Sequence, residues 1–186
     1  MTQRGFAEVV AVAEHVAGQS RAANALGLTS ERSAGTDALV QLVGEDAAEP
    51  AVATRFVEIR TWANERLGWD HVPAFWRGIA RRPRYLAAAW EKTKLVLGPG
   101  EIDELTKFAV ALACASLAGN RYFVEYYQAA FRQIGFDDET VVELAGLVNH
   151  YASFNTVAHA FQLESPGETT LAEPAVDGVA TNSRPD

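Results

Sequence analysis

The chain has 186 residues, of which 48% are hydrophobic, and its formal net charge is −8. This length and apolar content fit one packed domain with a loose end rather than a disordered protein. The negative charge argues against a nucleic-acid partner, because a phosphate-binding protein needs a basic face.

The chain contains a single cysteine, Cys114. One cysteine excludes an internal disulfide and a cysteine-cluster metal site, and it fits a reducing compartment. We therefore predict a cytoplasmic protein with no metal and no cofactor. Glu8 and Glu14 indicate an amphipathic helix rather than a secretory signal near the N-terminus. The longest apolar run, residues 108–119, is shorter than the roughly 20 residues that cross a bilayer, so no membrane segment is expected.

Residues 1–49 are predicted to form a variable, partly helical N-terminal extension. Apolar residues recur at helical spacing over residues 5–17, and Gly18 can end that helix. Residues 21–28 can add a short turn or helix. Residues 39–43 can form another short helix within a region otherwise rich in loop-type residues.

Residues 50–163 predict the main helical domain. Pro50 can open a helix because its missing N–H is not needed there, and Gly68 can end it. Further helices are expected from Pro73 to about 80, from Pro83 to Val96, from Asp103 to about 118, over 122–134, and from Asp137 to about 163. No segment has a strand pattern, so the predicted fold class is all-α. Residues 164–186 are rich in Pro, Gly, Ser and acids and predict a disordered acidic tail.

Several short motifs follow one another within this domain. They are Val72-Pro73-Ala74-Phe75-Trp76-Arg77, Trp90, Lys94, Pro99-Gly100, the apolar run 111–119, Ala129-Ala130, Gly135 with Asp138-Glu139, Asn155, and 158–163. In this order they resemble the alkylhydroperoxidase D-like, or carboxymuconolactone decarboxylase-like, superfamily over residues 51–163. The resemblance implies a helical bundle of that type without a β-sheet. It also implies a homo-oligomer, typically a trimer or a multiple of one.

The resemblance also implies that the redox centre of the family is degenerate here. Peroxidase members carry Gly-Cys-x-x-Cys-x-x-x-His with an upstream Glu; one thiolate attacks the peroxide and the other resolves the sulfenate. Aligned on Gly119, the two cysteines fall at Asn120 and Phe123. The His falls at Tyr127 and the Glu at Phe108. The decarboxylase branch keeps the His, so the chain departs from that branch as well.

Three side chains are weak catalytic candidates: Cys114, Glu125 and Tyr127. Cys114 fits a packing role better than that of a displaced peroxidatic thiol, because burial makes a thiol inert. Glu125 can act as an acid or base if it is buried. Tyr127 occupies the position of the family His, and a buried phenol there needs a hydrogen-bond partner.

Six residues are candidates for ligand binding: Phe108, Asn120, Tyr122, Phe123, Tyr126 and Tyr127. The five aromatic ones are called the aromatic cluster below. Phe123 and Tyr127 share one helix face, as do Tyr122 and Tyr126. Rings at the place of a redox pair either close the core or line a site for a small apolar or aromatic molecule, and both readings stay open.

We therefore expect a divergent alkylhydroperoxidase D-like protein that has lost the thiol redox motif and serves as a small-ligand-binding, structural or accessory protein. The alternative is an enzyme with a non-standard active site, either hydroperoxide-reducing or carboxymuconolactone decarboxylase-like. His150 and His159 point to opposite sides of one predicted helix and cannot share a metal ion. His15 lies in the extension and receives no functional assignment.

Overall fold

The computed structural model describes residues 1–162. Within them it contains eight α-helices and no β-strand, which confirms the predicted all-α class. Residues 1–150 form one compact unit, and the described residues 151–162 belong to a second. The tail predicted to be disordered, residues 164–186, lies outside the described residues.

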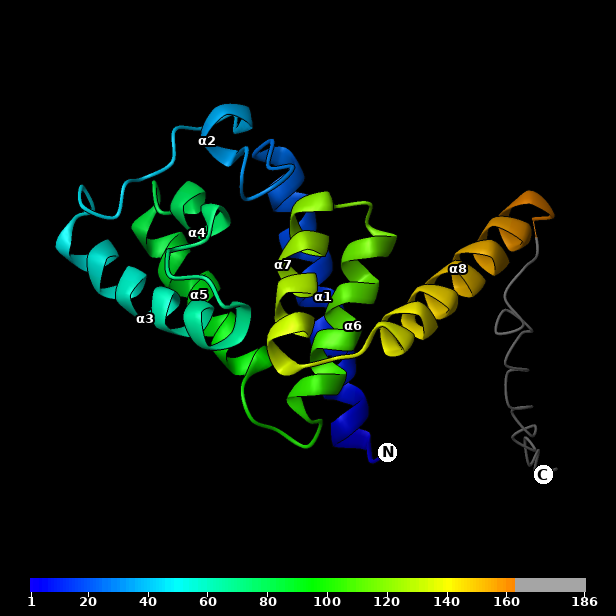
Figure 1. Ribbon diagram of the computed structural model, residues 1–186. Coiled ribbons are helices and arrows are strands. Elements are labelled where there is room, and N and C mark those ends of the chain that lie inside the picture. Colours follow the sequence, from blue (N-terminus) through cyan, green and yellow to red (C-terminus); the bar gives the residue numbers. More distant parts are fainter. Residues whose placement is uncertain (163–186) are drawn as a thin grey trace, which may run out of the picture. The chain divides into compact units, whose positions relative to one another are not determined.

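From α3 onward the helices follow one another closely, whereas a long irregular segment connects α2 to α3 (Figure 1). They are α1 (Gln3–Ala25), α2 (Ala34–Asp37), α3 (Pro50–Leu67), α4 (Ala74–Ile79), α5 (Pro83–Leu97), α6 (Glu104–Leu117), α7 (Arg121–Ile134) and α8 (Asp138–Ala160). No helix within residues 1–162 combines the length and the hydropathy needed to cross a membrane.

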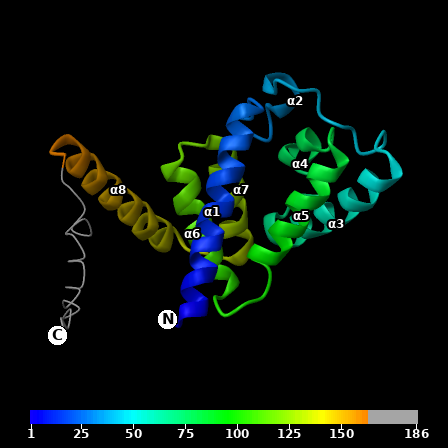
Figure 2. The ribbon, with the colours of Figure 1, turned by 180° about the vertical axis from the view of Figure 1, so that it is seen from behind.

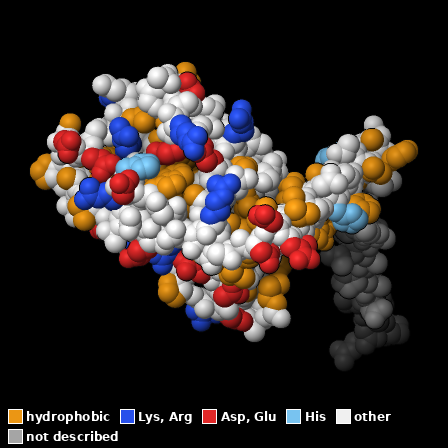
Figure 3. Space-filling view, viewed as in Figure 1, with side chains coloured by type: hydrophobic (Ala, Val, Ile, Leu, Met, Phe, Trp, Pro, Cys, Tyr) orange, Lys and Arg blue, Asp and Glu red, His pale blue; other side chains and the backbone are white. Residues whose placement is uncertain are grey.

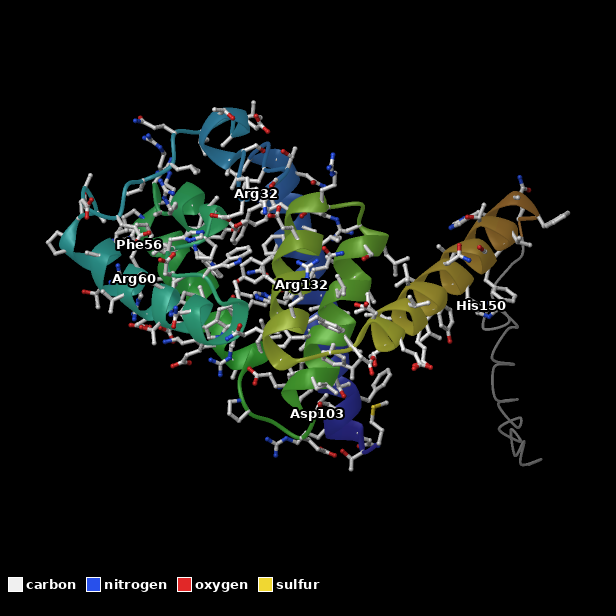
Figure 4. All side chains as sticks on the ribbon, viewed as in Figure 1. Arg32, Phe56, Arg60, Asp103, Arg132 and His150 are labelled. Atoms are coloured by element: carbon white, nitrogen blue, oxygen red, sulfur yellow. The ribbon has the colours of Figure 1, made fainter. Side chains whose placement is uncertain are left out.

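The helix ends predicted from Pro, Gly and Asp are largely confirmed. Pro50 occupies the first turn of α3, and Gly68 ends that helix in the left-handed conformation at φ 69°. Gly135 ends α7 in the same way at φ 88°, a backbone conformation that glycine adopts without steric cost. Asp103 caps α6, at whose start it lies (Figure 4), by accepting a hydrogen bond of 2.8 Å from the Thr106 N–H.

Two predictions for the N-terminal extension are wrong. Helix α1 does not end at Gly18 but continues to Ala25, because burial of Ser20 and Ala23 in the core outweighs the weak helix preference of one glycine. Residues 39–43 are not helical. The Val43 N–H instead donates to the Arg77 carbonyl at 3.1 Å, so tertiary contacts with α4 replace the helical hydrogen bonds.

The core of residues 1–150 lies between two groups of helices, one formed by α1, α6 and α7 and the other by α3, α4 and α5. Helix α6 packs on both α1 and α7, and α7 also packs on α3. Helix α5 joins the groups because it contacts α3, α4 and α1 (Figure 2). The N-terminal extension is therefore part of the compact unit, and Val12 and Val16 of α1 are completely buried.

Helix α8 differs from the other long helices because none of its residues is buried. Val142 and Leu147 are 69% and 56% exposed. Figure 3 shows hydrophobic side chains exposed along this helix. Charged side chains of both signs are mixed over the rest of the face in view, without a continuous basic patch.

Candidate functional site

The aromatic cluster lies where α6 and α7 pack together, and its five side chains are at most 2% exposed. The Phe123 and Tyr127 rings are stacked with their centroids 5.9 Å apart. The Phe108 ring lies 6.2 Å from that of Tyr127. On the other side, Phe123 meets Phe75 of α4 edge to face at 5.1 Å. The rings thus fill the space between the helices by direct contact, in geometries that aromatic pairs prefer.

One hydroxyl of the cluster is hydrogen-bonded to the segment that precedes α2. The Tyr122 hydroxyl donates to Glu31 Oε2 at 2.8 Å and accepts a hydrogen bond of 3.0 Å from the Phe75 N–H. Burial raises the pKa of Tyr122 well above its usual value, and the nearby Glu31 carboxylate adds to this effect. The phenol therefore stays protonated and serves as a structural donor.

The other two phenols are equally enclosed. Burial raises the pKa of Tyr126 and that of Tyr127, and the neighbouring Cys114 thiol adds to the shift at Tyr127. The Trp76 indole N–H lies near the Tyr126 hydroxyl but outside hydrogen-bonding geometry, and it has no other partner within residues 1–162. Neither phenol can act as a base at neutral pH.

The side chain of Asn120, where the sequence alignment predicts the first cysteine of the family motif, joins α7 to α1. Its Oδ1 accepts a hydrogen bond of 2.7 Å from the Phe123 N–H and so caps α7. Its Nδ2 donates to the Ser20 carbonyl at 3.1 Å and to Asn24 Oδ1 at 2.5 Å, both on α1. With a side chain that is completely buried, Asn120 has a structural role that accounts for its carboxamide.

The weak catalytic candidates do not meet in one place. Cys114 lies half-buried on α6, and burial raises the pKa of its thiol. Glu125 is half-buried on α7, where its Oε2 accepts a hydrogen bond of 3.2 Å from the Glu31 N–H. It also lines an open cavity of about 490 Å³ together with Thr29 and Arg121. No group of three or more His, Cys, Asp and Glu residues within 1–162 is arranged to hold a metal ion.

Sequence reasoning missed Glu31, which connects its own segment to residues 71–74 and to α7. Both carboxylate oxygens accept hydrogen bonds of 3.0 Å from the Ala74 N–H at the start of α4. His71 Nε2 lies 3.2 Å from Glu31 Oε1, and its ring stacks on Trp69. Because these partners are far apart in sequence, no local pattern points to the residue.

Sequence reasoning also missed a buried polar group between α1 and α5. His15 Nε2 lies 2.9 Å from Thr93 Oγ1, and Gln19 Nε2 donates to the same oxygen at 3.3 Å. All three side chains are buried. Burial lowers the pKa of His15 to about 4, and the charge of Lys92 acts in the same direction. Helical spacing does place residues 15 and 19 on one face, but nothing local identifies Thr93 as their partner.

The comparisons with known proteins identify the fold. No family model and no curated protein matches the chain. A solved structure of the alkylhydroperoxidase AhpD core from Rhodospirillum rubrum is 29% identical to it, with a TM-score of 0.62. The match covers 70% of this chain and 95% of that one. The chain therefore has an AhpD-like all-α fold, as the sequence motifs predicted.

Proposed function

We propose that this AhpD-like chain is a non-redox protein with a structural or small-molecule-binding role rather than a thiol peroxidase. The observation that carries the proposal is the position of Asn120 and Phe123. These residues stand where the family motif has its two cysteines, and both are sealed in the core. A carboxamide and a phenyl ring cannot attack a peroxide oxygen, and the two side chains are only 0% and 1% exposed.

The remaining thiol does not replace the missing pair. Reduction of a hydroperoxide by a cysteine requires a thiolate and then a second thiol to resolve the sulfenate. Burial raises the pKa of Cys114, which lowers its thiolate fraction at neutral pH. The chain supplies no second cysteine. Both chemical requirements are therefore unmet within one copy.

We also propose that the protein self-associates through α8. A helix of 23 residues without any buried side chain is unusual for a stable chain, because packing of an apolar face normally holds a helix in place. Exposed Val142 and Leu147 supply apolar surface for a second copy. Light scattering should give the mass of a trimer or a multiple of it. The change Leu147→Glu should lower that mass, whereas Glu143→Gln should leave it unchanged.

A second candidate is ligand binding within the aromatic cluster itself. The unpartnered N–H of Trp76 favours this reading, because a bound acceptor would satisfy a buried donor. A ligand there would have to separate rings that are in contact. Binding of a small aromatic probe that is lost on Trp76→Phe, with the fold retained, would support this candidate over a purely structural cluster.

Steady-state reduction of tert-butyl hydroperoxide with a dithiol reductant tests the main proposal. We expect the wild-type rate to equal the rate without protein, and Cys114→Ser to change nothing. Turnover that Cys114→Ser abolishes would overturn the proposal. Turnover that survives this change would instead support the alternative of a thiol-free enzyme.

A further inference from the structure

A groove opens to the surface between α1 and α5, apart from the aromatic cluster. Its volume is about 300 Å³, which suits a molecule with a single ring. The two helices lie side by side in Figure 2. The residues used below are His15, Gly18 and Gln19 of α1, Phe75 of α4, and Tyr85 and Lys92 of α5. We call this site the α1–α5 groove.

The hydrogen bonds under the groove favour one tautomer of His15. The Thr93 hydroxyl donates its only proton to the Ala89 carbonyl at 2.9 Å. With its proton on that carbonyl, the oxygen accepts from its two other neighbours, Gln19 Nε2 at 3.3 Å and His15 Nε2 at 2.9 Å. The proton of the neutral imidazole then sits on Nε2, which leaves Nδ1 as a hydrogen-bond acceptor.

Two acceptors in the groove lack a partner within residues 1–162. Neither His15 Nδ1 nor Gln19 Oε1 takes part in a described hydrogen bond, and neither belongs to the buried atoms that are shut off from solvent. Both side chains are nevertheless more than nine-tenths buried. The groove thus offers positioned acceptors to a molecule that brings its own donor.

The walls of the groove are apolar, and its charges are already paired. Phe75 is 1% exposed and continues inward to the aromatic cluster, whereas Tyr85 is 51% exposed. At the rim, Lys92 Nζ lies 2.6 Å from Glu14 Oε2. His15 is neutral at physiological pH because burial lowers its pKa to about 4. An anion therefore finds no free cation here, and a neutral ring is the better match.

From these contacts we infer that the α1–α5 groove binds a neutral single-ring phenol, whose ring packs on Phe75 and Tyr85 and whose hydroxyl donates to His15 Nδ1. The site goes beyond the proposed function, and it requires neither a thiol reaction nor an opening of the aromatic cluster. A hydrogen bond from the ligand to an acceptor that has no partner in the protein contributes about tenfold to affinity. The hydroxyl is thus the main determinant of specificity.

Titration of the full-length protein with phenol, followed by ligand-detected NMR, tests the site. The change Gly18→Leu should block the groove without harming the fold, since a Cβ built at Gly18 has no atom within 4 Å. We expect saturable binding to the wild type and at least about tenfold weaker binding to Gly18→Leu. The matched variant Ala7→Leu places the same side chain at an exposed position of α1 outside the groove, and it should bind as the wild type does.

Two further probes examine the hydroxyl. Anisole keeps the ring but cannot donate, so it should bind about tenfold more weakly than phenol; benzoate should not compete. Equal binding of phenol and anisole would overturn the role of His15. Absent phenol binding, or equal binding to the wild type and Gly18→Leu, would overturn the groove itself. None of these outcomes depends on hydroperoxide turnover, so the proposed function is judged separately.

Discussion

The aromatic cluster and the α1–α5 groove both bring aromatic rings together with polar side chains. They differ in how far the polar atoms are already hydrogen-bonded within the chain. Tyr122 of the cluster and Asn120 at the start of α7 form their hydrogen bonds with other parts of the chain. In the groove, His15 and Gln19 both bond to the Thr93 hydroxyl, and each has a second polar atom without a described partner. The alignment with the family motif predicts a site at the cluster, whereas the acceptors without a described partner lie in the groove. Position in a fold and capacity to bind are therefore separate properties.

Removal of the Asn120 side chain should have the largest effect. The change Asn120→Ala removes the cap of α7 and the two hydrogen bonds that Nδ2 donates to α1, for a combined loss of about 3 kcal/mol in the free energy of unfolding. The control Asp103→Ala removes an exposed cap and should cost about 1 kcal/mol. Urea denaturation measures both. Equal losses would contradict the view that the Asn120 side chain joins α7 to α1.

The change Tyr122→Phe probes the sealed cluster without emptying it. The ring stays, but the Phe75 N–H loses its acceptor and Glu31 loses a donor, so the free energy of unfolding should fall by about 2 kcal/mol. Tyr85→Phe, at a half-exposed position, should change it by less than about 0.5 kcal/mol. An unchanged free energy of unfolding for Tyr122→Phe would mean that the hydrogen bonds of the Tyr122 hydroxyl do not stabilise the cluster.

The buried His15 should make stability fall in mild acid. Its folded pKa of about 4 lies below the unfolded value of 6.5, so the unfolded chain binds a proton first and stability is lost as pH falls through 6.5 toward 4. From pH 7 to pH 5 this amounts to about 2 kcal/mol. Glu14 and Lys92 flank the imidazole, so the comparison is with His15→Asn, which should lack this part of the slope. Identical slopes would contradict a buried neutral imidazole.

The smallest expected effect is a gain at Gly18. This glycine lies inside α1, and an added Cβ meets open space. Gly18→Ala should therefore raise the free energy of unfolding by about 0.5–1 kcal/mol through helix propensity alone. A loss would show that the groove wall is tighter than the open space indicates. Thermal and urea unfolding at neutral pH measure the change.

Helix boundaries could be predicted where one residue decides them. Pro50, Gly68 and Gly135 impose their backbone preferences locally, and the structure confirms them. Gly18 was expected to end a helix, but distant packing partners outweigh its local preference. The same holds for residues 39–43, whose backbone groups pair with α4 and with the end of α1.

The candidate site was predictable only in part. The family motifs placed Asn120, Phe123 and Tyr127 together, and these residues do lie in one buried region. Their hydrogen bonds were not predictable, because Asn120 pairs with α1 about 100 positions away in the sequence. Glu31 and Thr93 escaped notice for the same reason. Ligand binding at the aromatic cluster stays a prediction.

The central claim is that the AhpD-like scaffold operates here without thiol redox chemistry. Intact mass spectrometry of the wild-type protein, mixed with one equivalent of hydroperoxide and quenched at successive times, tests it most directly. We expect the protein mass to stay unchanged while a free thiol such as glutathione is oxidised at its own rate. Rapid addition of one oxygen atom to Cys114, faster than oxidation of that reference thiol, would contradict it.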